Sequence, residues 1–240
     1  MKRAALAISA AVAIIACLLV NSFRFADAAN INLLPKNLFT SDLPLPTVNA
    51  VLATATFTAP NNTLISTGTN LDTGGSWVVH SGTWRVTGNR AKLYTATVNA
   101  SMTVNTANVN VRVADTLTIN TTATTRKAGV VVHRTSTGAF LYVLYENAGT
   151  GTITLYESNG SVTTLASASG IGNVASVALT VDSTSLNQII VKSGSTTLFT
   201  YNLSVGQIAT YKTGGAGSRQ GIISNNDIST RHDNFRVEQL

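Results

Sequence analysis

The chain of 240 residues is 44% hydrophobic and only 11% charged, with a formal net charge of +6. That hydrophobic content excludes a chain kept disordered by low hydrophobicity. The length fits one large all-β domain with an N-terminal extra segment, because β-sandwiches often contain ~200–250 residues, and the abundance of Thr, Asn, Ser, Ala, Val and Gly favours strands and polar turns over helices.

The first 28 residues have the features of an export signal. Lys2 and Arg3 form a positive start, residues 4–20 are an uncharged apolar run, and Ala26 and Ala28 place small residues where a signal peptidase cleaves. The apolar run lies at the lower edge of the length that spans a bilayer. We therefore predict a signal peptide over residues 1–28 and a secreted or cell-surface protein, with a virion as the alternative location.

Two other interpretations of this segment stay open. Residues 14–17 match a lipobox, which would make Cys17 a lipid-modified N-terminus, although residues 18–20 continue the apolar run where lipoproteins usually turn polar. The segment could also be retained as a hydrophobic helix for membrane attachment or assembly. Without cleavage, this N-terminal segment would be the protein's only contact with a membrane.

Cleavage after Ala28 would leave 13 basic and 9 acidic residues, a net charge of +4, and no cysteine. The mature domain would then contain no disulfide and would depend on its hydrophobic core. Arg126 and Lys127 are the only adjacent basic pair after the signal. We therefore expect no nucleic-acid partner, because nucleic-acid binding needs a basic stripe or patch.

The rest of the chain divides into a linker and one domain. Residues 29–50 contain three prolines and show no sustained periodicity, so we predict an extended lead-in or linker. Over residues 51–240 the pattern becomes short strands separated by turn signals, without a convincing apolar repeat of 3.6 residues. The sequence also shows no internal repeat of greater length, which disfavours a propeller or a solenoid.

Several strands can be predicted from their patterns. Residues 109–119 show the clearest alternation, and Asp115 interrupts their apolar face, so we expect a bulge or turn near it. Residues 129–132 and 140–145 are more continuously apolar and predict a central hairpin covered on both faces. Further strands are expected in the C-terminal half, around residues 177–181, 189–191, 197–203, 220–224 and 233–237.

Two local signals add detail to this pattern. Asn159-Gly160 joins residues 152–157 to residues 161–166 and predicts a hairpin with a type I′ turn, because this pair accepts the positive φ angles that such a turn needs. Trp77 and Trp84 flank a Ser81-Gly82 turn, and we expect both indoles to close one end of the core.

Short motifs also occur in a recognisable order along the domain. They are Thr56-Phe57-Thr58, Asn62-Thr63-Leu64, Asp72-Thr73-Gly74-Gly75-Ser76-Trp77, Ser81-Gly82-Thr83-Trp84, Gly88-Asn89-Arg90-Ala91, residues 129–134 and Asp233-Asn234-Phe235. In this order they resemble the concanavalin A-like, laminin-G-like jelly-roll superfamily, in particular its small secreted or phage-associated modules. The resemblance covers residues 51–240 and implies a two-sheet antiparallel jelly-roll sandwich. Because this fold hosts lectins, glycosidases, adhesion modules and virion proteins, it implies no single function.

The sequence contains no recognised catalytic or metal-binding motif. Glycosidases that the chain resembles carry a Glu-x-Asp-x-x-Glu strand, whereas the only glutamates here, Glu146, Glu157 and Glu238, sit in no such motif. The three histidines are scattered, without a second ligand at metal spacing. We therefore expect no enzyme activity, no cofactor and no zinc site. Calcium needs only carboxylate and carbonyl oxygens, yet no Asp-x-Asp-x-Asp-Gly loop indicates it.

What remains is binding. His133, Arg134, Tyr142, Tyr145 and Glu146 lie in successive predicted strands that are dense in aromatic residues. The resemblance implies a concave sheet that can hold a sugar, with aromatic rings against sugar C–H surfaces and charged groups on the hydroxyls. Alternation places Tyr142 and Glu146 on one face and Tyr145 on the other, so one of these sets must be core. The sequence thus predicts a non-catalytic extracellular carbohydrate-binding or adhesion module whose partner is a glycan or cell-surface polysaccharide.

One alternative from a different functional class stays open. The chain could be a structural subunit of a virion or extracellular filament that self-assembles through its β-sandwich. Its partners would then be copies of itself, and the proline-containing arm within residues 29–50 would be the assembly element. The low charge and the Thr-, Asn- and Ser-rich composition suit either function.

Overall fold

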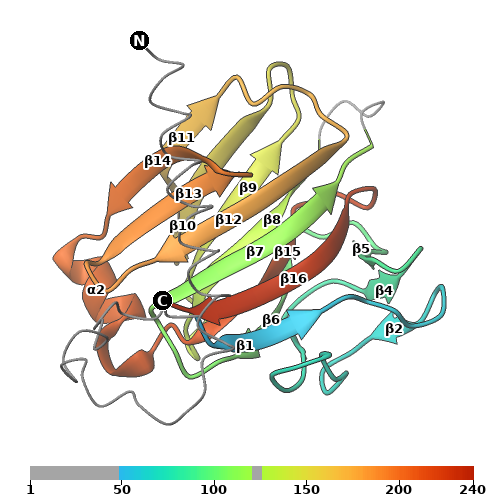
Figure 1. Cartoon of the computed structure of the whole chain (residues 1–240), viewed down its shortest axis with the longest axis horizontal. Coiled ribbons are helices and arrows are strands. Elements are labelled where there is room, and N and C mark those ends of the chain that lie inside the picture. Colours follow the sequence, from blue (N-terminus) through green and yellow to red (C-terminus); the bar gives the residue numbers. More distant parts are fainter. Residues whose placement is uncertain (1–48, 121–125) are drawn as a thin grey trace, which may run out of the picture. The chain divides into compact units, whose positions relative to one another are not determined.

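The computed structural model describes residues 49–120 and 126–240, so the predictions for residues 1–28 and for nearly all of the linker lie outside the described residues. The described chain forms two antiparallel sheets that face each other as a jelly-roll sandwich (Figure 1). This confirms the predicted fold class. No helix in the described part of the chain is long and apolar enough to cross a membrane.

The nine-stranded sheet has the order β14-β13-β12-β7-β16-β5-β4-β2, and β1 also pairs with β16. Its strands are β1 (Val51–Ala55), β2 (Leu64–Ile65), β4 (Trp84–Val86), β5 (Ala91–Leu93), β7 (Val111–Thr118), β12 (Ser176–Ser183), β13 (Gln188–Ser193), β14 (Thr196–Asn202) and β16 (Arg231–Gln239). The C-terminal strand β16 therefore lies inside the sheet, between β7 and β5.

The seven-stranded sheet has the order β11-β10-β9-β8-β15-β6-β3. Its strands are β3 (Val78–Val79), β6 (Ala100–Asn105), β8 (Lys127–Arg134), β9 (Phe140–Glu146), β10 (Thr152–Asn159), β11 (Ser161–Ser169) and β15 (Arg219–Ser224). Strands β11 and β14 are edge strands at the same side of the sandwich (Figure 1).

The strongest sequence patterns form the elements that they predict. β7 alternates between buried and partly exposed residues, with Asp115 facing the core. The irregularity expected near Asp115 lies opposite it in β16, where the register shifts between Asp233 and Arg236. β8 and β9 pair as the central hairpin and are almost continuously buried, as predicted.

The Asn-Gly signal gives the predicted hairpin, but the predicted turn type is wrong. Asn159 pairs with Ser161, so Gly160 alone connects β10 to β11. Only Gly160 has a positive φ, of 79°, whereas a type I′ turn needs a positive φ at both central residues. A register shift between Leu155 and Tyr156 changes the pairing of these strands before the turn.

One short helix was not predicted. The helix α2 (Val205–Tyr211) begins after Ser204, whose side chain accepts a hydrogen bond from Gln207 N, while the Gln207 side chain accepts one from Ser204 N. This reciprocal pair is a capping box, and its Ser-x-x-Gln pattern was the available sequence signal. Seven residues are too few to show an apolar period of 3.6 clearly.

Both tryptophans lie in the core, as expected. Trp77 packs between Phe57 and Phe235, with ring centres 6.1 and 5.1 Å away. The buried Trp84 donates from Nε1 to the Ser81 carbonyl at 3.1 Å. Because large aromatic rings bury much apolar area, the two indoles are major contributors to the stability of the core.

A buried polar link joins the two sheets. Nδ1 of His232 in β16 forms a hydrogen bond with Asp115 Oδ2 of β7 at 2.6 Å, and its Nε2 lies 3.1 Å from Ser224 Oγ of β15. The indole of Trp84 packs edge-on against His232, with ring centres 5.7 Å apart. Since buried polar groups are costly without hydrogen bonds, this link favours one stacking of the two sheets.

Candidate functional site

Three of the five predicted binding residues share the outer face of the seven-stranded sheet. Here they join Phe140 and Tyr156, and we call the five residues Arg134, Phe140, Tyr142, Glu146 and Tyr156 the aromatic face. Tyr142 is in register with Tyr156, and the Tyr156 hydroxyl donates to Glu146 Oε1 at 3.1 Å. The Arg134 guanidinium lies over the Phe140 ring, 4.6 Å from its centre.

The middle of the aromatic face is closed to solvent. The Tyr142 ring lies 5.0 Å from the Phe140 ring and 5.2 Å from the Tyr156 ring, and Tyr142 is only 1% exposed. Burial raises the pKa of the Tyr142 hydroxyl to about 12, and the nearby Tyr156 adds to the rise. A sugar could not stack on Tyr142 without displacing a neighbouring ring, so only the margins at Arg134, Glu146 and Tyr156 are accessible.

The other two predicted residues, Tyr145 and His133, lie in the interior of the sandwich. Tyr145 is buried and its hydroxyl donates to the Gly172 carbonyl at 2.7 Å. His133 is fully buried, with Nδ1 2.8 Å from Gly217 O and Nε2 2.8 Å from Ser183 Oγ. Burial lowers the pKa of His133 to about 4, so its imidazole is neutral at pH 7.

A bulge explains the position of His133. The register between β8 and β9 shifts between Val131 and His133, so His133 pairs with Leu141 and not with a residue of the outer face. Strict alternation from Val131 would place His133 outside and Arg134 inside. The bulge reverses both positions.

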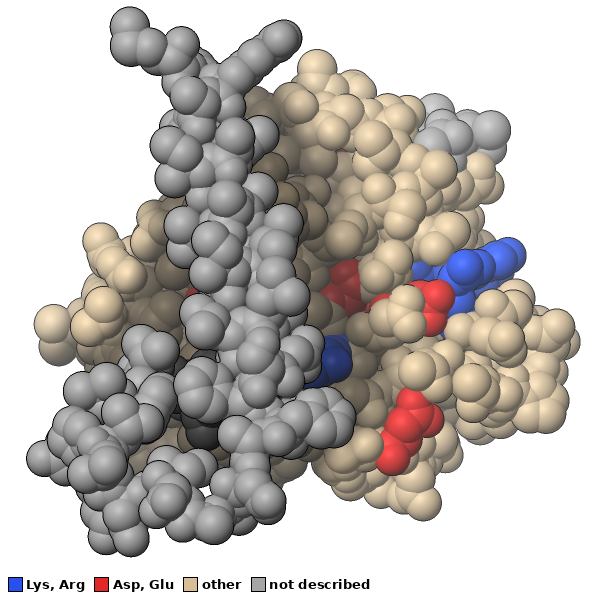
Figure 2. All heavy atoms as spheres, in the orientation of Figure 1, with Lys and Arg blue, Asp and Glu red and all other residues tan. Residues whose placement is uncertain are grey.

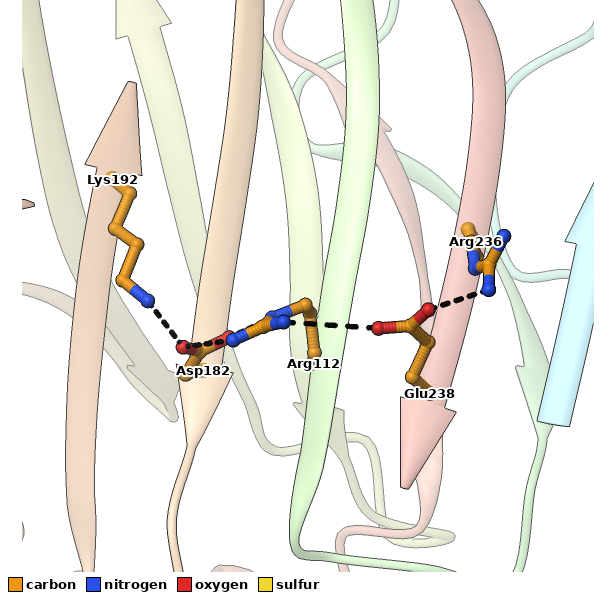
Figure 3. A network of polar contacts seen from close by, with 5 residues as sticks. All are labelled: Arg112, Asp182, Lys192, Arg236 and Glu238. Atoms are coloured by element: carbon orange, nitrogen blue, oxygen red, sulfur yellow. Dashed lines mark hydrogen bonds and ion pairs between the residues drawn. The ribbon is translucent and has the colours of Figure 1, made fainter. Parts of the chain in front are cut away.

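A different set of polar side chains crosses the outer face of the nine-stranded sheet. Figure 3 shows Lys192, Asp182, Arg112, Glu238 and Arg236, which follow one another across the neighbouring strands β13, β12, β7 and β16. We call these five residues the charged row. No sequence pattern predicted it, because its members come together only through strand pairing.

Each charge in the row contacts a charge of the opposite sign. The Asp182 carboxylate accepts hydrogen bonds from Lys192 Nζ at 2.7 Å and from Nε and Nη2 of Arg112 at 2.7 and 3.0 Å. Glu238 lies 3.8 Å from Arg112 Nη1 and 2.6 Å from Arg236 Nη2. Two parallel hydrogen bonds from one guanidinium to one carboxylate fix both the distance and the orientation of the pair.

The row is both ordered and accessible. Burial of Asp182 opposes its ionisation, but the hydrogen bonds from Arg112 and Lys192 outweigh this effect and lower the pKa of the carboxyl below its usual value. Arg112 and Arg236 have side chains that are 34% and 47% exposed. Lys192 is 24% exposed, whereas the side chains of Asp182 and Glu238 are only 6% and 16% exposed. The row therefore presents cationic donors at the surface, and the covered carboxylates hold them in place.

In the described residues, Glu146 and Glu157 do not form a carboxylate pair, and the one Ser-His-Asp set is buried. Glu146 lies on the outer face of the seven-stranded sheet, whereas Glu157 accepts from Gln207 and Tyr211 on the opposite side. Ser224, His232 and Asp115 are connected in the order of a hydrolase triad. However, all three are buried inside the sandwich, so no substrate reaches Ser224. No group of three metal-binding side chains occurs in the described ranges 49–120 and 126–240.

Comparison with known proteins identifies the fold. No protein-family model matches the sequence, and no curated protein matches it. A mutant of the GH43 protein BlXynB from Bacillus licheniformis aligns with a TM-score of 0.56 and 16% identity, over 78% of this chain and 39% of that one. The chain therefore spans well under half of that protein.

Two smaller modules align over nearly their whole length. The carbohydrate-binding module CBM66 from Bacillus subtilis gives a TM-score of 0.52 and 10% identity over 68% of this chain and 95% of the module. The CBM2 module of the evolved Dit protein of Lactobacillus casei phage J-1 gives a TM-score of 0.50 and 10% identity. This alignment covers 79% of this chain and 95% of the module. The chain thus has a β-sandwich fold like that of carbohydrate-binding modules, consistent with the jelly-roll resemblance of its sequence.

Proposed function

We propose that this protein is a non-catalytic, extracellular glycan-binding module that holds its ligand on the charged row of the nine-stranded sheet. The observation that carries the proposal is the charged row, in which covered carboxylates hold the partly exposed Arg112, Lys192 and Arg236 on one sheet face. The fold shared with two carbohydrate-binding modules supports it, as does the signal-like sequence of residues 1–28 for the location.

The chemistry of the row fits sugar hydroxyls. Arg112, Lys192 and Arg236 can donate hydrogen bonds to hydroxyl oxygens, and Glu238, whose side chain is 16% exposed, is the more accessible of the two acceptors. The strands hold these groups in place before binding, which lowers the entropy cost of complex formation. The lowered pKa of Asp182 also disfavours a role as general acid, because that role needs a carboxyl with a raised pKa.

A glycan array with purified protein tests this assignment. A glycan that binds should have an affinity in the millimolar to micromolar range, which corresponds to ~4–8 kcal/mol. Arg112→Gln should weaken it at least about tenfold, while thermal unfolding checks that the variant stays folded. Arg134→Gln, on the aromatic face, is the matched control and should bind normally. Loss of binding only in the Arg134 variant would move the site to the face that the sequence predicted.

A second candidate function, a self-assembling structural subunit of a virion or filament, is favoured by the edge strands. Neither β11 nor β14 contains a charged residue or a proline, and Val162 of β11 is 54% exposed. Natural edge strands usually carry such residues to prevent pairing with another chain. Light scattering separates the two functions: monomers support the binding module, whereas large particles that Val162→Lys dissociates support assembly.

A further inference from the structure

Three cations stand next to one another on the outer face of the nine-stranded sheet, beside the charged row. Arg85 of β4 is in register with Lys92 of β5, and Lys92 is in register with Arg231 of β16. The neighbours of Arg85 and Lys92 in β4 and β5 point into the core, as does His232 next to Arg231, so the three cations point outward. Figure 2 shows Lys and Arg side chains gathered on this face over the region of β4 and β5.

These three cations differ from the charged row in lacking opposite charges. Among the described residues, none of the three forms a salt bridge, and the nearby Asp233 is already paired with Arg90 at 3.2 Å. Like charges directly opposite each other on paired strands destabilise a sheet. The arrangement thus costs stability in the free protein, and an anion would relieve that cost.

A pocket lies at two of these cations. It has a volume of about 270 Å³ and is lined by Lys92, Thr118, Ile119, Asn120, Ser229 and Arg231. Apart from Ile119, every lining side chain is polar or basic. Next to the third cation, the Tyr94 ring is 54% exposed and lies 4.1 Å from the Arg85 guanidinium.

We propose that Arg85, Lys92 and Arg231 form a subsite for an anionic sugar unit that carries a carboxylate or a sulfate. This proposal rests on the proposed glycan-binding function and names the ligand class. The planar guanidinium of Arg231 can give two parallel hydrogen bonds to either anion, and Lys92 supplies a compact second charge. Thr118 and Ser229 provide hydroxyls for the uncharged part of the sugar.

The position of the subsite also indicates the size of the ligand. Arg231 of the subsite and Arg236 of the charged row belong to the same strand, β16. A register shift interrupts β16 between them, and they pair with Thr118 and Ala114 of β7, four residues apart. Four residues of strand span roughly 13 Å. A single sugar would therefore reach one of the two areas, whereas an acidic oligosaccharide could contact both.

Calorimetric titration with matched glycan pairs tests the subsite. One pair is an oligogalacturonide and its carboxyl-reduced neutral counterpart, and the other is a sulfated galactan oligosaccharide and its desulfated counterpart. At least one acidic member should bind about tenfold or more tightly than its neutral counterpart. The pair that shows the preference distinguishes a carboxylate from a sulfate.

Two double variants then locate the preference. Lys92→Gln/Arg231→Gln should abolish the preference for the acidic glycan and leave neutral binding within about twofold, because only the charged contacts are lost. Arg134→Gln/Arg219→Gln removes the same charge from another pair of cations in register, on the seven-stranded sheet, and should retain the preference. Thermal unfolding of both variants checks that they remain folded.

Three results would overturn the subsite. The first is equal affinity for acidic and neutral glycans, which would leave the glycan-binding function intact. The second is a preference that survives in the Lys92/Arg231 variant or disappears in the control. The third is a short DNA duplex that binds as tightly as the acidic glycan and loses the same affinity in the Lys92/Arg231 variant. That result would indicate a general polyanion surface. Failure of every glycan to bind would be a different outcome, because it would remove the proposed function together with the subsite.

Discussion

The aromatic face and the charged row occupy the outer faces of opposite sheets, and they use their side chains in different ways. On the aromatic face, Phe140, Tyr142 and Tyr156 pack against one another. Their ring faces, which could otherwise stack on a sugar, are therefore largely covered. In the charged row each carboxylate is also satisfied, yet the arginines remain partly exposed and keep hydrogen-bonding capacity for a ligand.

This difference shows that residue type alone does not identify a binding face. The rings of Phe140, Tyr142 and Tyr156 lie next to one another on adjacent strands, and with no groove between them they form a small apolar cluster. Charged side chains are long and hydrated, so they pair without closing the surface. We therefore expect changes on the aromatic face to affect mainly stability, and changes in the charged row to affect mainly binding.

The largest expected effect comes from truncating the aromatic face. Tyr142→Ala should lower the free energy of unfolding by about 3–5 kcal/mol, as for other buried aromatic residues. Denaturant unfolding measures this change, and Trp84→Ala provides a reference for a core position. A loss below about 1 kcal/mol would mean that Tyr142 behaves as a surface residue, and the contrast between the two faces would then disappear.

The pH dependence should reveal that His133 is a core residue. Its folded pKa of about 4 is below the unfolded value of about 6.5, so its contribution is fully present above pH 6.5 and is lost as the pH falls toward 4. A shift of this size corresponds to roughly 3 kcal/mol. Unfolding titrations of the protein and of His133→Gln should differ in slope over this window. Identical slopes would contradict the buried, neutral histidine.

A smaller loss of stability is expected in the charged row. Asp182→Asn removes the charge that holds Arg112 and Lys192, and it should cost about 1.5–3 kcal/mol, the range for hydrogen bonds to charged groups. Asn keeps the size and one acceptor, so the change isolates the charge. Because the carboxyl pKa of Asp182 is lowered, its stabilisation should hold above the unfolded pKa of about 3.9 and decrease at lower pH. Asp182→Asn should lack this acid dependence.

The smallest effect on stability should come from the most exposed member of the row. Arg236→Gln should change the free energy of unfolding by less than about 0.5 kcal/mol, because exposed ion pairs contribute little. It should nevertheless weaken glycan binding by about threefold or more, since Arg236 is a hydrogen-bond donor to the ligand. Unaltered affinity in this variant would restrict the binding area to Arg112, Asp182 and Lys192.

The sequence predicted the fold wherever a local pattern was long enough. The alternation of β7 and the apolar hairpin of β8 and β9 were sufficient, because side-chain direction repeats every two residues within a strand. The interior position of His133 could not be predicted, since one bulge in β8 inverts the faces of His133 and Arg134 and leaves no distinct local pattern. The helix α2 went unpredicted because its only signal is the capping box at Ser204.

The charged surfaces could not be predicted for a different reason. Arg112 and Asp182 are 70 residues apart in the sequence, and they meet only because β7 pairs with β12 in one particular register. The three cations Arg85, Lys92 and Arg231 likewise come from separate strands and form no basic run along the chain. Such surfaces form only when the strands pair. A search for basic residues that are adjacent in the sequence does not detect them.

The place of β16 has a consequence for the order of folding. This strand is made after all the other described strands, yet it pairs with β1, β5 and β7 and carries the His232 that links the sheets. Until residues 231–239 leave the ribosome, the two halves of the nine-stranded sheet have no strand between them. Contacts between distant parts of a chain also form slowly. We therefore expect the domain to fold only once β16 has been made, and a chain that stops at Thr230 should show no cooperative thermal transition.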